Sequence, residues 1–303
     1  MTGLSVEEIE HPKYGAGIRL TNGEVELLIP RDFGPRVMFY GFCGGANMLC
    51  DEAHLDQQVD DEVWRAVGGH RFWHSPEAFP RTYMPDNEPV EISLTDSGVR
   101  IVQKEEKWVQ VQKEVELTLA PGGGRVDIVH KMKNGNAWDI SLALWGITMM
   151  APGGEEWIPQ PNVDTGYLSN RHISLWSYTR MDDPRLGWGS RYIRLKQEPG
   201  RKTPCKIGLN NEAGWASYFN HGNMFIKGFV YADGVTYPDG GCSYETYVNE
   251  FMLEMESLSP LVTVRAGESA YHKEFWDLIP DVSAPGTEEE MEQIHAVHIE
   301  GKF

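Results

Sequence analysis

Residues 113–147, KEVELTLAPGGGRVDIVHKMKNGNAWDISLALWGI, hold three runs of alternating apolar and polar residues, with a turn signal after each of the first two. The runs cover residues 113–119, 125–132 and 140–147, and the turn signals are 121–124 and 134–135. A period of two residues is typical of a β-strand, and Gly-rich or Asn-Gly sequences favour tight turns between antiparallel neighbours. The stretch therefore predicts three consecutive β-strands joined by turns.

The same alternation continues on both sides of this stretch. Further strands are expected at residues 24–29, 36–40, 90–95, 99–102, 191–195, 215–219, 224–231, 245–249, 251–256 and 270–278. Only residues 54–66 and 287–294 favour a helix, the second because Thr287 is a good N-cap residue followed by three glutamates. Many short strands with few helices between them indicate an all-β protein built as an antiparallel sandwich.

Length and composition are consistent with this class. The chain has 303 residues, of which 41% are hydrophobic, and its 32 glycines and 18 prolines suit a fold with many turns. The sequence shows no linker-like tract, internal repeat or low-complexity segment. We therefore expect a single β domain over residues 1–283 and an acidic C-terminal tail over residues 284–303.

Charge and cysteine usage narrow the partners and the compartment. The formal net charge of −18 repels the phosphates of nucleic acids and the anionic surface of membranes. No apolar run approaches the ~20 residues of a membrane span, and residues 1–10 lack the apolar core of a secretion signal. The four cysteines are scattered and form no Cys-x-x-Cys pair. We expect a cytoplasmic protein with reduced thiols and no nucleic-acid or membrane partner.

Residues 68–77, GGHRFWHSPE, hold the densest group of reactive side chains. His70 and His74 can transfer protons near neutral pH. Arg71 offers a fork of donors to hydroxyls or carboxylates, and Trp73 suits the apolar face of a sugar ring. These properties favour a binding or catalytic site. The alternative is a buried aromatic strand whose histidines make internal hydrogen bonds.

The spacing of His70 and His74 would suit a metal pair on a helix. The flanking Gly-Gly and Ser-Pro pairs disfavour a helix, and residues four apart in an extended chain lie about 13 Å apart, too far to share a metal. The chain also lacks a Gly-x-Ser-x-Gly elbow, a phosphate-binding Gly-Lys-Ser/Thr loop and a strand–Gly-x-Gly-x-x-Gly–helix unit. We therefore expect neither a metal nor a cofactor.

A second group lies at residues 245–260, ETYVNEFMLEMESLSP. With a period of two, Glu254 and Glu256 share one strand face, while Leu253 and Met255 share the other. The two glutamates lie about 7 Å apart, and their repulsion would raise the pKa of one carboxyl, which suits proton transfer. The alternative is a solvated polar face.

A third feature is the turn sequence YPDGGC at residues 237–242, which contains Asp239. Lys227, on a preceding strand, points either into the same cleft or into water. The candidate sugar-binding residues are Arg71, Trp73, Glu77, Lys227, Asp239 and Glu256.

Three segments resemble the galactose mutarotase-like superfamily, the aldose 1-epimerase type of β-supersandwich, and most closely a bacterial branch of it. They are Asn22-Gly23-x-Val25-x-Leu27-x-x-Pro30-x-x-Phe33-Gly34-Pro35-Arg36, Gly68-Gly69-His70-Arg71-x-Trp73, and Leu253-Glu254-Met255-Glu256 followed by Pro260 and Gly267-Glu268. In layout the resemblance spans nearly the whole chain, although each motif is short. It implies an antiparallel β-supersandwich with few short helices and a cleft for a carbohydrate.

The resemblance also implies roles for individual residues. In mutarotases the strand glutamate is the general base, which makes Glu254 the base candidate, and His70 or His74 is then the acid candidate. Mutarotases usually take their acid from a mid-chain His-x-Tyr-Phe segment, whereas residues 144–150 hold no histidine here. The identity of the acid therefore stays open.

The leading hypothesis is an epimerase- or mutarotase-like enzyme acting on a sugar or sugar derivative, with a small carbohydrate as its ligand. Glu254 would take the proton of the anomeric hydroxyl, and a histidine would protonate the ring oxygen. The alternative is a non-catalytic carbohydrate-binding protein on the same scaffold, and a third hypothesis is a lyase or hydrolase relative. The sequence leaves open the sugar, the anomer, the oligomeric state and the role of the tail.

Overall fold

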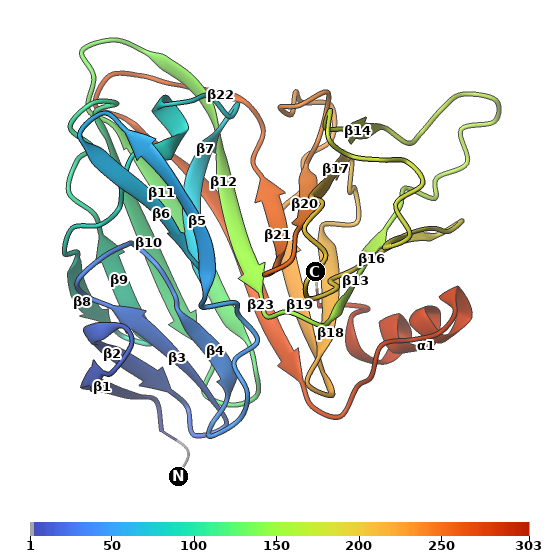
Figure 1. Cartoon of the computed structure of the whole chain (residues 1–303), viewed down its shortest axis with the longest axis horizontal. Helices are drawn as coiled ribbons and strands as arrows, with labels where there is room; N and C mark the ends of the chain where they lie inside the picture. Colours follow the sequence, from blue (N-terminus) through green and yellow to red (C-terminus); the bar gives the residue numbers. More distant parts are fainter. Residues whose placement is uncertain (1–2, 303) are drawn as a thin grey trace.

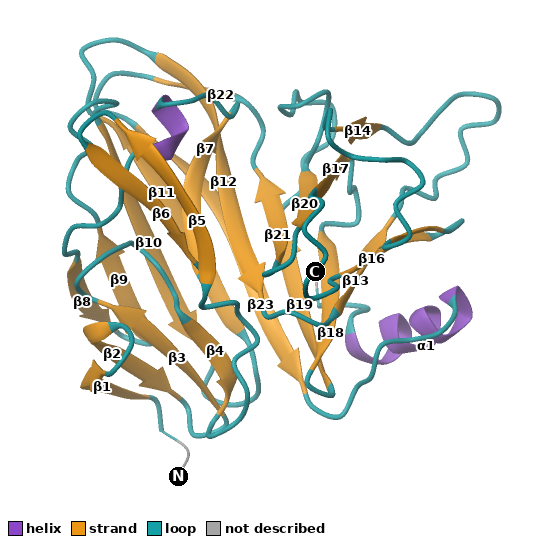
Figure 2. Ribbon diagram, viewed as in Figure 1, coloured by secondary structure: helices purple, strands orange, loops and turns teal. Residues whose placement is uncertain are grey.

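The computed structural model describes residues 3–302, and the strands found there pair in antiparallel fashion (Figures 1 and 2). A four-stranded sheet near the N-terminus contains, in order, β1 (Ser5–His11), β2 (Gly15–Thr21), β3 (Val25–Pro30) and β4 (Phe39–Phe42). A separate hairpin is formed by β5 (Ala53–Val59) and β6 (Glu62–Val67).

The largest sheet has ten strands. Their order is β15 (Leu186–Trp188), β16 (Tyr192–Lys196), β13 (Glu155–Pro159), β18 (Trp215–Asn220), β19 (Asn223–Phe229), β23 (Ser269–Ile279), β11 (Val126–Asn134), β10 (Val111–Leu119), β9 (Gly98–Val102) and β8 (Glu91–Thr95). The first two strands of the 113–147 stretch are the hairpin β10–β11 of this sheet.

The next sheet has seven strands and carries the third strand of that stretch. Its order is β14 (Ile173–Leu175), β17 (Cys205–Leu209), β20 (Tyr244–Val248), β21 (Leu253–Leu258), β12 (Ile140–Met150) and β22 (Val262–Val264), with β7 (His70–Ser75) also paired to β12. The third strand, β12, thus pairs with β21, β22 and β7 rather than with β11. The chain crosses from one layer to the other after β11.

The two large sheets pack face to face and enclose the main hydrophobic core. Leu117 and Ile128 from the ten-stranded sheet belong to the same buried cluster as Leu144 and Met255 from the seven-stranded sheet. This arrangement confirms the predicted all-β antiparallel sandwich. Burying one such side chain stabilises the fold by about 1.5–3 kcal/mol. No helix in residues 3–302 has the length and apolar character that crossing a membrane requires.

The expected helix at residues 54–66 is wrong, because this segment forms the β5–β6 hairpin. Trp64 and Ala66 alternate with exposed residues and are themselves buried, in a second hydrophobic cluster. Tertiary packing against this cluster decides the structure of a segment whose polar composition gave no strand signal.

The helix expected at residues 287–294 is confirmed as α1 (Glu288–His298), and the Thr287 side chain accepts a hydrogen bond from the backbone N–H of Glu290. The segment expected to be an acidic tail packs against the β domain. Met291 and Ile299 are buried in a third hydrophobic cluster with Trp157 and Trp215.

A polar network lies buried between the two large sheets. The Lys227 ammonium donates to the backbone oxygens of Gly146 and Met255 and to Thr148 Oγ1, all within 3.0 Å, and it lies 3.1 Å from Glu274 Oε1. Lys227 and Glu274 are buried, and the lysine holds the pKa of the Glu274 carboxyl below its usual value against the effect of burial. The pair thus joins β19 and β23 of one sheet to β12 and β21 of the other.

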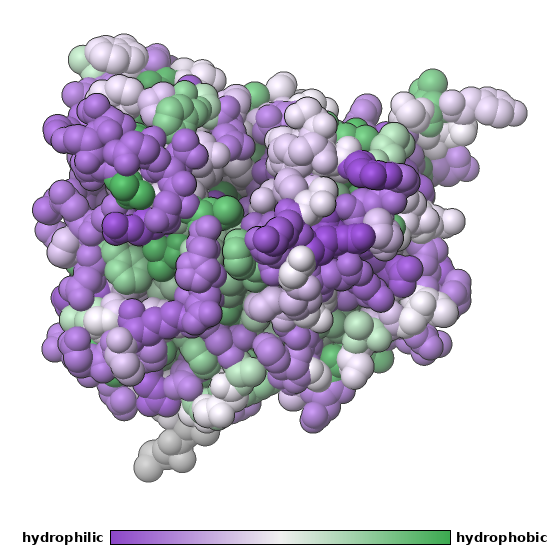
Figure 3. Space-filling model, in the orientation of Figure 1, coloured by the Kyte–Doolittle hydropathy of each residue, from purple (hydrophilic) through white to green (hydrophobic). Residues whose placement is uncertain are grey.

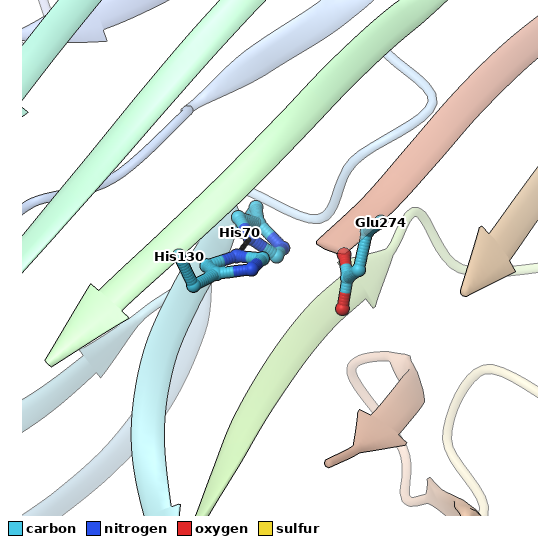
Figure 4. Close-up of side chains that lie close together, drawn as sticks. All are labelled: His70, His130 and Glu274. Carbon is cyan, nitrogen blue, oxygen red and sulfur yellow. Dashed lines mark hydrogen bonds between the residues drawn. The ribbon is translucent and has the colours of Figure 1, made fainter. Parts of the chain in front are cut away.

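Histidines extend this network. His70 Nε2 lies 2.8 Å from His130 Nε2 (Figure 4). His70 Nδ1 lies 3.0 Å from Thr148 Oγ1. Ser257 Oγ lies 2.7 Å from His272 Nε2 and donates to Glu274. Burial lowers the pKa of His272 to about 3, so this imidazole is neutral at physiological pH.

Replacing Lys227 with Met should strongly destabilise the fold, because Glu274 would keep a buried negative charge without its cation. The expected loss in free energy of unfolding is about 3–5 kcal/mol, measured by urea denaturation at pH 7. Lys131→Met is the control, since Lys131 is partly exposed and its partner Glu114 keeps two hydrogen bonds from Arg100, so that a loss of only about 0–1 kcal/mol is expected. Equal, small losses in both variants would contradict this account of the network.

Candidate active site

A cleft lies on the face of the seven-stranded sheet that points away from the main core. It comprises a hollow of about 550 Å³ and an adjoining hollow of about 400 Å³. The hollows share the lining residues Gln57, Glu77, Tyr83, Trp145 and Trp176. Figure 3 shows hydrophobic patches among hydrophilic surface on the half of the molecule that contains β5, β6 and β12. Such a cleft is large enough for a small ligand.

Strand register brings the polar side chains of the cleft together. Ile147 on β12 is opposite Arg71 on one side and opposite Glu256 on the other, and Glu256 is opposite Glu245 of β20. Two residues further along these strands, Tyr247 of β20 is opposite Glu254 of β21. Because residues that are directly paired point to the same side of a sheet, these side chains share the cleft face.

Arg71 and Glu254 form the first ion pair of the cleft. Arg71 Nη2 donates to Glu254 Oε1 at 3.2 Å, and the guanidinium carbon lies 4.0 Å from the ring centroid of Trp73 and 4.8 Å from that of Trp64. Burial raises the pKa of Glu254 to about 7, and the Arg71 charge opposes this shift. Glu254 is therefore poised to gain or lose a proton near neutral pH.

Lys206 on β17 forms the second charged group. Its ammonium lies 2.8 Å from Glu245 Oε2 and 2.8 Å from Glu256 Oε2, and it lies within 4.7 Å of the ring centroids of Trp145 and Trp176. Trp145 Nε1 also donates to Glu256 Oε2 at 2.9 Å. Burial raises the pKa of Glu245 to about 8, with Lys206 opposing the shift. Each cation thus lies close to two tryptophan rings, and Arg71 pairs with one buried glutamate while Lys206 pairs with two.

Two acidic residues stand at the smaller hollow. Glu77 accepts a hydrogen bond from the Tyr83 hydroxyl, and Asp239 Oδ2 accepts one from Ser75 Oγ at 3.2 Å. Both carboxylates line this hollow. Glu256 does not line either hollow, since it is fully buried behind the side chains that it contacts. The structure therefore brings together Arg71, Trp73, Glu77, Asp239 and Glu254, with Glu256 behind them.

The structure does not bring His70, His74 or Lys227 into the cleft, which corrects the sequence-based expectation for these three residues. On β7, Arg71 and Trp73 face the cleft, so the alternating His70 and His74 face the other side of the sheet and are buried there. Lys227 is enclosed in the network between the sheets. His70 therefore matches the alternative that the sequence left open, a buried histidine that makes internal hydrogen bonds.

Neither ring nitrogen of His74 has a hydrogen-bond partner within residues 3–302, and burial lowers the pKa of His74 to about 3. This imidazole is therefore neutral at physiological pH and enclosed in the sheet interior. It cannot supply a proton to a ligand beside Glu254.

Sequence reasoning missed Trp64, Trp145, Trp176, Lys206 and Glu245 as site residues. Lys206 lies on a strand, β17, that was not expected, and Trp64 lies in the segment expected to be helical. Glu245 carried a usable signal, because it alternates with Tyr247 in an expected strand next to the Glu254 strand.

The ligand atoms of His70, His130 and Glu274 lie within 4.8 Å of one another, a spacing that could suit a metal. The two histidines hydrogen-bond directly, however, and the Lys227 ammonium neutralises the Glu274 carboxylate at 3.1 Å. The donor set is therefore satisfied by the protein itself, and the residues fit a structural network better than a metal centre.

No protein-family model matches the chain, and no curated protein matches it in sequence. Solved structures do match. A proposed aldose 1-epimerase from Escherichia coli K12 gives a TM-score of 0.51 at 10% identity, covering 91% of this chain and 99% of that protein. A proposed mutarotase from Salmonella typhimurium gives 0.55 at 9% identity, covering 91% and 97%.

A TPR-domain containing protein from Parabacteroides distasonis gives a TM-score of 0.61 at 14% identity, covering 90% of this chain. The chain spans about half of that protein, 49% of its length. The chain therefore has the same fold as the proposed aldose 1-epimerase and the proposed mutarotase. At these identities the likeness concerns the fold alone.

Replacing Arg71 with Met should raise the pKa of Glu254 further above its present value of about 7, because the guanidinium opposes the effect of burial. A shift of about 1–3 units is expected from loss of an adjacent cation. Carbon-13 NMR of glutamate-labelled protein measures it, and Glu254→Gln assigns the resonance. An unchanged titration would show that Arg71 does not control this carboxyl.

Proposed function

We propose that the chain binds a sugar in the cleft and interconverts its anomers, with Glu254 as the general base. The observation that carries the proposal is a buried glutamate with a pKa of about 7 at the wall of an aromatic cleft. A base with a pKa near the working pH combines a populated carboxylate with a useful driving force for proton uptake.

The other cleft residues support sugar binding. Arg71 Nε and Nη1 are buried and have no hydrogen-bond partner among the described residues, so a hydroxyl of a ligand would satisfy them. Glu77 and Asp239 can accept hydrogen bonds from other hydroxyls, and Trp73 offers an apolar surface beside them. We propose these four residues as sugar contacts.

In this mechanism Glu254 takes the proton of the anomeric hydroxyl and the bond between C1 and the ring oxygen breaks. Rotation about the C1–C2 bond then presents the other face of the aldehyde, and ring closure inverts the anomer. Arg71 stays hydrogen-bonded to Glu254 and limits where its carboxylate can move. The ring oxygen must also receive a proton from an acid.

A non-catalytic carbohydrate-binding protein is the second candidate function. The observation that favours it is the absence of His70 and His74 from the cleft lining, which removes the acid that the family resemblance implies. Binding without turnover would distinguish this candidate from the enzyme.

Glu254→Gln should lower the rate of anomer interconversion by about 10²–10⁴-fold, because the amide cannot accept the proton. The rate is measured by polarimetry on freshly dissolved glucose, galactose, mannose and xylose. Glu114→Gln is the control, since Glu114 on β10 of the ten-stranded sheet pairs with Arg100 on β9 and lines neither hollow.

A variant as fast as the wild type would remove Glu254 from the mechanism. Calorimetric binding of a sugar that wild-type protein does not interconvert would favour the non-catalytic candidate. If the protein neither binds nor interconverts any of these aldoses, that result contradicts the proposed function.

A further inference from the structure

The cleft holds a second carboxyl group that the base assignment leaves unused. Glu245 lines the smaller hollow together with Trp145 and Trp176, and it lies directly opposite Glu256 in the strand register. Its Oε2 forms an ion pair with Lys206 Nζ at 2.8 Å, and neither Oε1 nor Oε2 has a hydrogen-bond partner among the described residues. An uncommitted carboxyl oxygen is therefore buried at the floor of the cleft.

The distribution of charge favours a proton on Glu245. Glu245 and Glu256 occupy opposite positions, which places their Cβ atoms about 4.5–5.5 Å apart, and they share the single Lys206 ammonium. Two carboxylates this close oppose double ionisation. Glu256 accepts a second donor, Trp145 Nε1, so the proton is better placed on Glu245. Burial and the charges of Glu256 and Asp239 all act to raise the pKa of Glu245, to about 8.

The position of Glu245 relative to Glu254 suits action on one sugar ring. Tyr247 is opposite Glu254, and Glu245 lies two residues from Tyr247 on the same strand face. This diagonal arrangement corresponds to roughly 7–8 Å between the two glutamates. Two hydrogen bonds of about 2.7 Å, made to two oxygens attached to the same carbon, span a distance of that order. The hydroxyl and the ring oxygen at C1 therefore fit between the two carboxyl groups.

We propose that Glu245 is the general acid of the cleft and acts with Glu254, so that two carboxyl groups perform both proton transfers. The proposal rests on the proposed sugar chemistry of this cleft and supplies the acid that neither His70 nor His74 can provide. Lys206 and Glu256 then act as positioning residues that hold Glu245 at the floor.

The proton balance closes over one cycle. The Glu254 carboxylate takes the proton from O1, the electron pair of the C1–O5 bond moves to O5, and the Glu245 carboxyl gives its proton to O5. After rotation about C1–C2, O5 attacks the other face of C1 and returns its proton to Glu245. Glu254 returns its proton to the former carbonyl oxygen, so both groups recover their starting states.

The pH dependence of anomer interconversion tests the pair. Below pH about 7 Glu254 holds its proton and cannot act as the base, and above pH about 8 Glu245 loses the proton that it must donate. The wild-type rate should therefore fall on both sides of a maximum between these values. The probes are glucose, galactose, mannose and xylose.

Glu245→Gln should lower the rate by about 10²–10⁴-fold and remove the alkaline limb of the profile, whereas Glu245→Asp should keep that limb at a reduced rate. The matched control is Glu156→Gln. Glu156 is also a fully buried glutamate with a pKa of about 8, but it accepts from the Tyr244 hydroxyl and lines neither hollow. Its replacement should leave the rate and the profile unchanged.

The outcomes separate this proposal from the one on which it rests. A wild-type protein that accelerates none of the aldoses contradicts the proposed function and the acid role together. An inactive Glu254→Gln variant beside a fully active Glu245→Gln variant with an intact alkaline limb overturns the acid role alone. Where Glu245→Gln fails to fold by circular dichroism, the wild-type profile decides, because a rate that stays flat through the alkaline range overturns the proposal.

Discussion

A carboxylate can be buried beside tryptophans only if it keeps a cation or a proton. This requirement shapes the whole cleft. Arg71 serves Glu254, Lys206 serves Glu245 and Glu256, and each cation is covered by two indole rings. Because three glutamates meet only two cations here, at least one proton is favoured at the floor. The lack of a third cation reduces stability, and it also leaves carboxyl groups that exchange protons near neutral pH.

Because successive side chains of a strand point to opposite faces, the seven-stranded sheet separates the charged side chains of the cleft from those of the interior. On β7 the cleft receives Arg71 and Trp73, and the interior receives His70 and His74. The interior side carries its own charges in the Lys227–Glu274 pair, which ties the two large sheets together. We therefore attribute the buried histidines and Lys227 to the stability of the sandwich, and we propose that the cleft glutamates act on the ligand.

Much of the fold was predictable because alternation is a local property of the sequence. The strands around β10, β11, β18, β19, β21 and β23 follow directly from it. Pairing between strands is not a local property of the sequence, so the β5–β6 hairpin was missed. At the candidate site, short motifs predicted Glu254, Arg71 and Trp73, which the structure places in the cleft lining. Which face of the sheet His70 occupies, and whether Lys206 reaches the cleft, depends on which strands are neighbours. The pattern of a single sequence does not contain that information.

The most direct test is a crystal structure of the Glu254→Gln variant soaked with the aldose that binds most tightly among glucose, galactose, mannose and xylose. The account predicts one ring in the cleft against Trp73, with O1 hydrogen-bonded to the side chain at position 254 and the ring oxygen facing Glu245. A sugar bound elsewhere on the protein, or a cleft that stays empty at saturating sugar, would contradict it.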